Sequence, residues 1–464
     1  MKTITVGDIL KVLNGQLLQG SSDLKVISIS TDTRTLKPGD FFIALKGENF
    51  DGHTFLTQAF EKGACGALIS SESGEVFPHD RALICVEDTL KGLQDLAKWN
   101  RMSIAPKVVG ITGSTGKTTT KDMIAQVLSM RYKTLKTKGN YNTEIGLPLT
   151  LLELDDTIQM AVVEMGMRGF GQIRELALIA KPDIGVITNI GESHMELLGS
   201  KNGIARAKAE LIEELHEDGI AVLNGDDPFV CEMKKYSKGS ACTYGTGEAV
   251  DVRAIDIVSN GEDGIEFTVV SWKGQEKIRV PLPGLHNVYN ALAAICMGLL
   301  EGLDLHIIAQ GLAEFKASER RGVIINLPNG LKIIDDTYNA SPASVGAAIR
   351  VLTEVAGDRR KVAILGDMLE LGDFSLKGHR IVGELLASSG VDLFFGIGPL
   401  SKNTVAAAQE GGMHESAFWF ASNEEALQKF RQMACKDDVI LVKGSLAMNM
   451  QEIVGGLKRE PTSL

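Results

Sequence analysis

Residues 108–122 read VVGITGSTGKTTTKD, and this stretch decides the fold class. The apolar run of a buried strand ends at a loop of Gly, Ser and Thr, and a helical pattern begins at Lys117 and Thr118. Such a loop surrounds a phosphate with backbone N–H groups, while the Lys reaches terminal phosphates and the Thr can bind Mg²⁺. We therefore predict nucleotide binding by Gly110, Gly113, Ser114, Thr115, Gly116, Lys117, Thr118 and Thr119.

The glycine spacing of this loop departs from the common pattern. G-x-x-x-x-G-K-[ST] would require glycine at position 111, where Ile111 stands, and Gly110 lies one residue earlier. The alternative is a chance glycine turn. The strand before the loop and the helix after it, from about Lys117 to Met130, favour nucleotide binding.

Apolar runs alternating with helical patterns predict an α/β fold of three domains. Residues 1–85 indicate a small N-terminal α/β domain. Residues 86–315 carry near-continuous apolar runs at 159–166, 183–190 and 219–224, as in a mostly parallel sheet of the P-loop type, and a long buried helix near 282–303. Residues 316–464 repeat the pattern, with strands expected near 331–336, 361–367, 391–398, 416–421 and 437–444, as in a Rossmann-like domain.

Composition narrows the possible partners and compartment. The net charge of −11 argues against nucleic acid, whose phosphates are bound by basic faces, and requires any cation for a small anionic ligand to be local. The six cysteines are scattered, which suggests a reducing compartment. The N-terminal residues do not resemble a signal peptide, and no apolar run reaches eighteen residues. We expect a cytoplasmic protein without a membrane span.

Three polar residues follow the predicted central strands. Glu164 ends one apolar run, His194 follows another, and Lys208 lies in a helical pattern. Ligands of open α/β sheets gather at the carboxyl ends of the strands, so Glu164 and His194 could face the phosphates and hold metal. For His194 alone, hydrogen bonding is the better interpretation, because Mg²⁺ prefers oxygen ligands. For Lys208 alone, the plain alternative is a solvated lysine paired with Glu210 or another helix carboxylate.

Further polar clusters lie in predicted turns, where Asp, Asn and Gly are common for conformational reasons alone. Binding groups also concentrate in loops on a rigid scaffold, so both interpretations stay open. The clusters contain Asp32 and Arg34; Lys46, Asp51 and His53; Lys138, Asn140 and Asn142; and Asp335 and Asp336.

Taken together, these segments resemble the Mur ligase family over nearly the whole chain. The family loop, G-x-x-G-x-x-G-K-T, accommodates Gly110, Gly113 and Gly116 and so explains the unusual spacing. More specific are TKGNYNTEIGLPLTLL, VPLPGLHNVYNALAA, DDTYNASPASV and LGDMLELG. Two positions depart from the family pattern: Ser341 stands where Asn is frequent, and Leu446 stands where Arg is common.

The resemblance implies roles for residues that had plain alternatives. Lys208 would be carbamylated, which turns an amine into an anionic oxygen ligand for Mg²⁺. Glu164, His194 and Thr118 would complete the metal sites, and catalysis would depend on Lys117, Lys208, His194 and Glu164. For ATP, the resemblance implies Asn287 near adenine, Arg321 in the nucleotide site and Asp336 at the ribose. It implies that the N-terminal domain, residues 1–85, binds the UDP-sugar, with Asp32, Arg34, Lys46 and Asn142 as the binding residues.

The implied activity is ATP-dependent formation of an amide bond. A UDP-N-acetylmuramoyl-tripeptide would be joined to D-alanyl-D-alanine through an acyl phosphate, with two Mg²⁺ ions, by a monomeric enzyme. One alternative is a family member that adds the third amino acid, although its D-N-P-R motif is absent from the sequence. Another is a nucleotide-dependent switch protein that binds partners.

Overall fold

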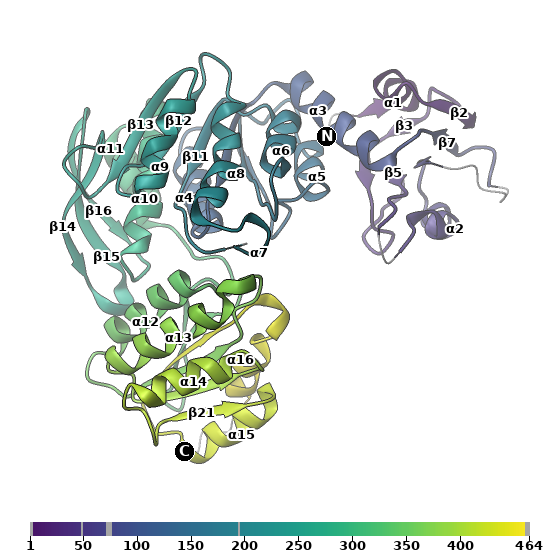
Figure 1. The fold of residues 1–464 in the computed structure, drawn as a ribbon. Coiled ribbons are helices and arrows are strands. Elements are labelled where there is room, and N and C mark those ends of the chain that lie inside the picture. Colours follow the sequence, from purple (N-terminus) through teal and green to yellow (C-terminus); the bar gives the residue numbers. More distant parts are fainter. Residues whose placement is uncertain (1–2, 48–49, 71–76, 194, 460–464) are drawn as a thin grey trace.

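The computed structural model describes residues 3–47, 50–70, 77–193 and 195–459, which form three successive α/β units (Figure 1). In the first unit, five short strands form a sheet in which only β2 is antiparallel to its neighbour. Its order is β2 (Gln16–Gln19), β7 (Ala82–Cys85), β6 (Gly66–Ile69), β5 (Asp40–Ile43) and β4 (Ser28–Ser30). Two further strands, β1 (Ile4–Thr5) and β3 (Lys25–Val26), pair beside helix α1 (Val6–Leu13), and α2 (Leu56–Glu61) precedes β6.

The second unit is built on a sheet of nine strands. Strand β8 (Lys107–Thr112) lies inside it between β10 (Met160–Glu164) and β11 (Ile184–Ile187). The chain extends the sheet from β8 first toward β10 and β9 (Thr134–Lys136), and later in the opposite direction through β11 and β12 (Ile220–Asn224). The carboxyl end of β8 is therefore a topological switch point, the position where open α/β sheets bind ligands.

Helices cover both faces of this sheet, as near-continuous apolar strands require. One hydrophobic core joins the sheet to α4 (Lys117–Ser129), α10 (His286–Leu300) and α11 (Leu305–Ala313). The other core includes α3 (Thr89–Ile104), α5 (Gly146–Leu152), α6 (Gln172–Ala180) and α8 (Lys201–Glu213). The predicted helices after the loop and near 282–303 are confirmed as α4 and α10. Two short helices, α7 (Met195–Leu198) and α9 (Pro228–Cys231), lie in connections.

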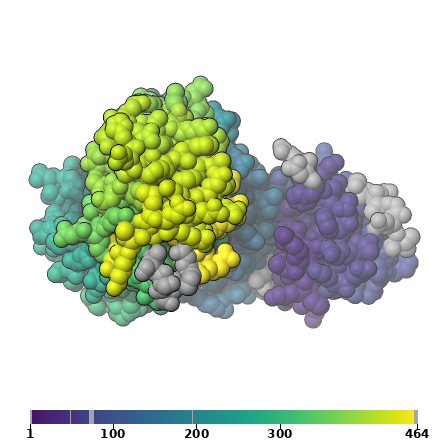
Figure 2. All heavy atoms as spheres, turned by 90° about the horizontal axis from the view of Figure 1, so that it is seen from below, coloured from purple at the N-terminus to yellow at the C-terminus, as the bar shows by residue number. Residues whose placement is uncertain are grey.

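The third unit contains a six-stranded sheet that is parallel except at one edge. Its order is β17 (Val323–Asn326), β18 (Lys332–Asp336), β22 (Val439–Lys443), β19 (Lys361–Gly366), β20 (Leu393–Ile397) and β21 (Ala417–Phe420). Helices α12 (Pro342–Ala356), α13 (Ser375–Ser388) and α14 (Ser401–Glu410) accompany one face, and α15 (Asn423–Met433) and α16 (Gln451–Lys458) the other. Seen from below, this unit covers the central one, and the N-terminal unit lies to one side (Figure 2).

The predicted α/β class with three sheet-containing units is confirmed, but the sequence patterns missed one edge of the central sheet. Strands β13 (Ser240–Gly245), β14 (Val252–Ser259), β15 (Ile265–Ser271) and β16 (Gly274–Val280) extend that sheet, and the last three pair antiparallel. In β14 to β16, buried residues mostly alternate with more exposed ones, so these strands lack the continuous apolar runs that mark the buried parallel strands. The exact domain boundaries stay a prediction, because α3 contacts both α1 and the central helices α5 and α6.

Candidate active site

The predicted phosphate loop lies between β8 and α4, at the switch point of the central sheet. Its backbone is held by the neighbouring strand end: the amide of Ser114 donates to the carbonyl of Asn189 at 2.9 Å, and that of Thr115 to Asn189 Oδ1 at 3.0 Å. Thr188 Oγ1 donates to the carbonyl of Thr115 at 2.7 Å. The residues that follow β11 therefore hold the loop in its shape.

Glycine is required at two positions of this loop. Gly116 has φ of 80°, and a Cβ there would lie 2.7 Å from Asn290 Oδ1. A Cβ on Gly113 would lie 1.8 Å from Thr188 Oγ1. Gly110 differs, because it lies inside β8, where a Cβ would meet Met165 Cε at 3.0 Å. Gly113 and Gly116 therefore shape the loop, and Gly110 allows close packing beneath it.

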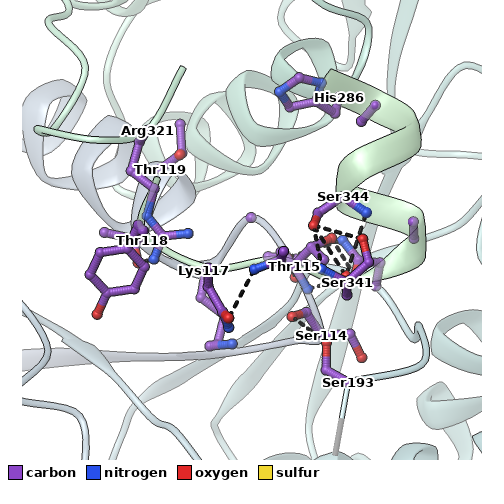
Figure 3. Close-up of a pocket in the computed structure, with 18 of the residues that line it drawn as sticks. Ser114, Thr115, Lys117, Thr118, Thr119, Ser193, His286, Arg321, Ser341 and Ser344 are labelled. Atoms are coloured by element: carbon purple, nitrogen blue, oxygen red, sulfur yellow. Dashed lines mark hydrogen bonds between the residues drawn. The ribbon is translucent and has the colours of Figure 1, made fainter. Parts of the chain in front are cut away.

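A cavity of about 1610 Å³ opens above the loop, between the central and C-terminal units. Many of the residues predicted from the sequence line it, and Figure 3 shows part of this lining. The lining includes Ser114, Thr115, Gly116, Lys117, Thr118, Thr119, Asn142, Glu164, Lys208, Asn287, Arg321 and Asp336. The lining does not include Gly110, Gly113, Asp32, Arg34 or Lys46. The predicted His194 lies outside the described residues.

Lys208 is buried in this cavity wall, with 1% of the residue exposed. Within the described ranges, the structure gives its Nζ no hydrogen bond or ion pair. Burial, assisted by the nearby charge of Lys117, lowers the pKa of Lys208 well below its ordinary value. Glu210 does not pair with it, because the Glu210 carboxylate accepts from the amides of Gly171 and Arg174 at 2.9 and 3.0 Å. The alternative of a solvated lysine paired with Glu210 is therefore wrong.

Glu164 ends β10 and is 2% exposed. Its Oε1 accepts a hydrogen bond from Asn142 Nδ2 at 2.8 Å, whereas Oε2 is buried without a partner among the described residues. A buried carboxylate oxygen normally has a partner, so this free oxygen in the cavity wall fits a cation ligand. Asn142, predicted for substrate, thus orients Glu164 in this structure.

Lys117 begins α4 and lies on the same wall. Its Nζ donates to the carbonyl of Gly113 at 2.9 Å. Burial lowers the pKa of Lys117, while Glu164 acts in the opposite direction. The loop thereby brings together a lysine and a carboxylate that lie far apart in the sequence.

The opposite wall comes from the C-terminal unit. Arg321 Nη2 donates to Thr118 Oγ1 at 3.1 Å, and the guanidinium lies 3.7 Å from the ring centroid of Tyr338 (Figure 3 shows Arg321 beside Thr118). Asp336, at the end of β18, accepts a hydrogen bond from the buried Lys443 at 2.6 Å. Lys443 ends the adjacent β22 in the sequence VKG, a signal that sequence reasoning overlooked.

Asn287 makes its hydrogen bonds within the protein. Its Nδ2 donates to the carbonyl of Pro283 at 2.8 Å, and its Oδ1 accepts from Asn290 Nδ2 at 3.0 Å. Asn290 Oδ1 in turn accepts a hydrogen bond from Thr120 Oγ1 on α4, at 3.0 Å. This chain of bonds links α10 to the helix of the phosphate loop, a connection that the sequence reasoning missed.

The two positions that depart from the family pattern both line the cavity. Ser341 is the N-cap of α12, and its hydroxyl accepts from the amide of Ser344. Leu446 is exposed and supplies no charge. The serine therefore has a structural role, and the leucine removes a candidate cation from this wall.

The N-terminal candidates lie in a separate unit (Figure 1). Arg34 and Asp32 form an ion pair of 2.7 Å, with 88% of the Arg34 side chain exposed. This pair holds the pKa of Asp32 below its ordinary value. Lys46 pairs through its backbone with Asp51. The structure thus separates the predicted UDP-sugar residues of this unit from the phosphate loop.

Comparison with known proteins identifies family models in three parts of the chain. Three family models match: the Mur ligase family catalytic domain at residues 25–101, the Mur ligase middle domain at 111–298 and the Mur ligase glutamate ligase domain at 320–446. A UDP-N-acetylmuramoyl-tripeptide–D-alanyl-D-alanine ligase of Bacillus subtilis is 42% identical, covering 99% of both chains. The Escherichia coli ligase of the same name is 36% identical, covering 100% of both.

Solved structures give the same result for the fold. MurF from Acinetobacter baumannii is 32% identical with a TM-score of 0.91, covering 99% of this chain and 100% of its own. MurF ligase from Thermotoga maritima in complex with ADP is 28% identical with a TM-score of 0.82, covering 93% of this chain and 97% of its own. The chain therefore belongs to the Mur ligase family over its whole length.

Proposed function

We propose that the protein is an ATP-dependent ligase that joins D-alanyl-D-alanine to a UDP-N-acetylmuramoyl-tripeptide. The observation that carries this proposal is the cavity between the central and C-terminal units, where the loop residue Lys117 meets Glu164 and the buried Lys208. The family and the ADP complex of the Thermotoga maritima neighbour support the use of ATP. The names of the full-length relatives support the two other substrates.

The chemistry explains why ATP is needed. A carboxylate is a poor acceptor for an amine, because it is anionic and has no good leaving group. Transfer of the γ-phosphoryl group to the tripeptide carboxylate gives an acyl phosphate and ADP. The amine of the dipeptide then attacks the acyl carbon, the C–O bond to phosphate breaks, and an amide and inorganic phosphate are formed after loss of one proton.

The first step brings two anions together, and local positive charge must offset their repulsion. Lys117 is placed at the helix start, where it can reach the terminal phosphates. Mg²⁺, when bound, would supply further charge stabilisation, and Thr118, Glu164, Lys208 as a carbamate and His194 are the proposed ligands. The unpartnered Oε2 of Glu164 supports that assignment.

The remaining roles follow the layout of the chain. Asn287, Arg321 and Asp336 line the cavity near the loop and are proposed to hold adenine, phosphate and ribose. Asp32, Arg34, Lys46 and Asn142 are proposed to hold the UDP-linked substrate. Domains at 1–85, 86–315 and 316–464 would divide these tasks, and closure would exclude water from the acyl phosphate. We infer a cytoplasmic monomer. Separately, no helix in the described part of the chain is long and apolar enough to cross a membrane.

Product formation tests this function against its alternatives. Phosphate release from ATP is expected only when the UDP-linked tripeptide and D-alanyl-D-alanine are both present, with a mass increase of the UDP-linked product. Release with a UDP-linked dipeptide and a free amino acid would instead indicate the ligase that adds the third residue. Slow phosphate release from ATP alone, at a rate that does not change when the UDP-linked tripeptide and D-alanyl-D-alanine are added, would indicate a switch protein.

Arg34→Ala is expected to raise the KM for the UDP-linked substrate more than the KM for ATP. Arg34 is exposed in the N-terminal unit and does not line the cavity at the phosphate loop. Its guanidinium offers several donors for an anionic or planar group. Steady-state kinetics with each substrate varied in turn measure both constants; an equal change in both, or no change, would contradict this placement.

A further inference from the structure

The linker between the central and C-terminal units contacts the phosphate-loop helix at two points. Residues 314–322 connect α11 to β17, and within them Ser318 and Arg321 reach back to α4. The Ser318 hydroxyl donates to Asp122 Oδ2, and Arg321 donates to Thr118 Oγ1 at 3.1 Å. Thr118 and Asp122 are four residues apart, so they lie on one helix face, one turn from each other. The linker and the helix therefore run antiparallel along this face.

Asp122 is a buried anchor for this contact, with 4% of the residue exposed. Its Oδ1 lies 2.7 Å from Lys136 Nζ and 3.4 Å from Lys121 Nζ. Lys121 is also buried, and its Nζ donates to the carbonyl of Thr137 at 2.8 Å. Both buried charges therefore have partners, although the Lys136 side chain is 48% exposed, and neither Asp122 nor Lys121 is left as an uncompensated charge inside the protein.

The same cluster reaches the residue with the free carboxylate oxygen. The amide of Glu164 donates to Thr137 Oγ1 at 3.0 Å, next to the carbonyl that Lys121 holds. Arg321 itself is less constrained by direct bonds: Nη2 contacts Thr118, the guanidinium lies over Tyr338, and Nε is buried without a partner among the described residues. A long side chain on an irregular linker loses much conformational entropy when it is fixed. Ser318 lies three residues before Arg321, and its bond to Asp122 restricts the backbone of the linker. Less conformational entropy is then lost when the Arg321 side chain is fixed.

We propose that Ser318 and Asp122 are positioning residues, which anchor the interdomain linker on α4 and so hold Arg321 beside Thr118 at the nucleotide. Neither Ser318 nor Asp122 lines the cavity, whereas Thr118 and Arg321 both do. The effect on ATP therefore passes through Arg321. This inference rests on the proposed binding of ATP at the loop, and it assigns to the linker a part in that binding.

The test uses Ser318→Ala in the full chain, with the affinity for a non-hydrolysable ATP analogue and Mg²⁺ measured by calorimetry. We expect affinity to fall about 3- to 10-fold, in the range of coupling carried by such networks, and Tm to stay near that of the wild type. Ser318→Thr keeps the hydroxyl and is expected to retain wild-type affinity. Ser388→Ala is the matched control, since the described hydrogen bonds of the exposed Ser388 hydroxyl go to carbonyls of its own helix α13, away from the linker and the cavity; its affinity should not change.

A double-mutant cycle separates positioning from a general structural effect. In an Arg321→Ala background, Ser318→Ala should cause no further loss of affinity. The inference would be overturned if Ser318→Ala lowered the affinity equally with and without Arg321, or if Ser318→Ala left the affinity unchanged. In either case, binding of the analogue by the wild type would still agree with the proposed function. Failure of the wild type itself to bind would contradict the function instead. Asp122→Ala should weaken affinity at least as much as Ser318→Ala; if it does not fold, the Ser318 variants decide.

Discussion

Lys117→Ala is expected to abolish ligation and to leave the fold intact. Its ammonium is the cation that the loop places at the start of α4, above the carbonyl of Gly113. Removing one group that stabilises charge in a transferring phosphoryl group costs about 3 kcal/mol or more, which is a rate decrease of at least about 100-fold. The lost bond to Gly113 contributes much less to folding, about 1 kcal/mol. Phosphate release in the presence of the UDP-linked tripeptide and D-alanyl-D-alanine measures the effect on catalysis, and Tm measures the effect on stability.

The control for this variant is Lys133→Ala in the same unit. Lys133 is exposed, and Thr157 Oγ1 is the only partner of its Nζ among the described residues. We expect full activity from this variant, since it removes the same charge from the protein without touching the cavity. Ligation at a near-normal rate by folded Lys117→Ala protein would be incompatible with the phosphate-loop assignment.

Lys208→Ala is expected to lose most activity, because we predict that Lys208 is carbamylated. Carbamate formation needs the neutral amine and CO₂, and an unperturbed lysine with a pKa of about 10.4 is almost wholly charged at pH 7. Burial and the charge of Lys117 lower the pKa of Lys208, which favours the neutral amine. Since the modification replaces a cation by hard oxygens of the kind that Mg²⁺ prefers, its loss should impair catalysis far more than stability.

Two further variants distinguish this prediction from a simple charge effect. Lys208→Arg should remain inactive, because a guanidinium keeps the charge but cannot become a metal ligand. Small carboxylates are expected to restore part of the activity of Lys208→Ala by occupying the vacated space. Arg206→Ala is the control on the same helix, where Arg206 pairs with Glu213 at the surface, and it should remain active. An active Lys208→Arg enzyme, or a high-resolution map with an unmodified Lys208 in the ATP–Mg²⁺ complex, would refute the prediction.

The local sequence predicted those parts of the site that are formed by consecutive residues. The strand, loop and helix at 107–129 depend on apolar periodicity and on glycines with no room for a Cβ, and both are visible in one short stretch. The buried parallel strands were predicted for the same reason, since burial on both faces leaves continuous apolar runs. The resemblance to the family then implied specific roles for Glu164, Lys208, Arg321 and Asp336, all of which line the cavity.

Contacts between distant segments were decided by the tertiary structure alone. Only parallel pairing of β18 with β22 brings Lys443 to Asp336, and only the packing of the cavity wall makes Asn142 a partner of Glu164. Burial of Lys208 likewise depends on how α8 packs, since its helical neighbours are mostly those of an ordinary amphipathic helix. The edge strands β14 to β16 escaped prediction because their buried and exposed residues mostly alternate, so they lack the continuous apolar runs by which the other strands were recognised. The sequence by itself determined the loop and the fold class through local sterics and hydrophobic periodicity, whereas partners and burial were decided by packing between segments that lie 22 to 107 residues apart in the chain.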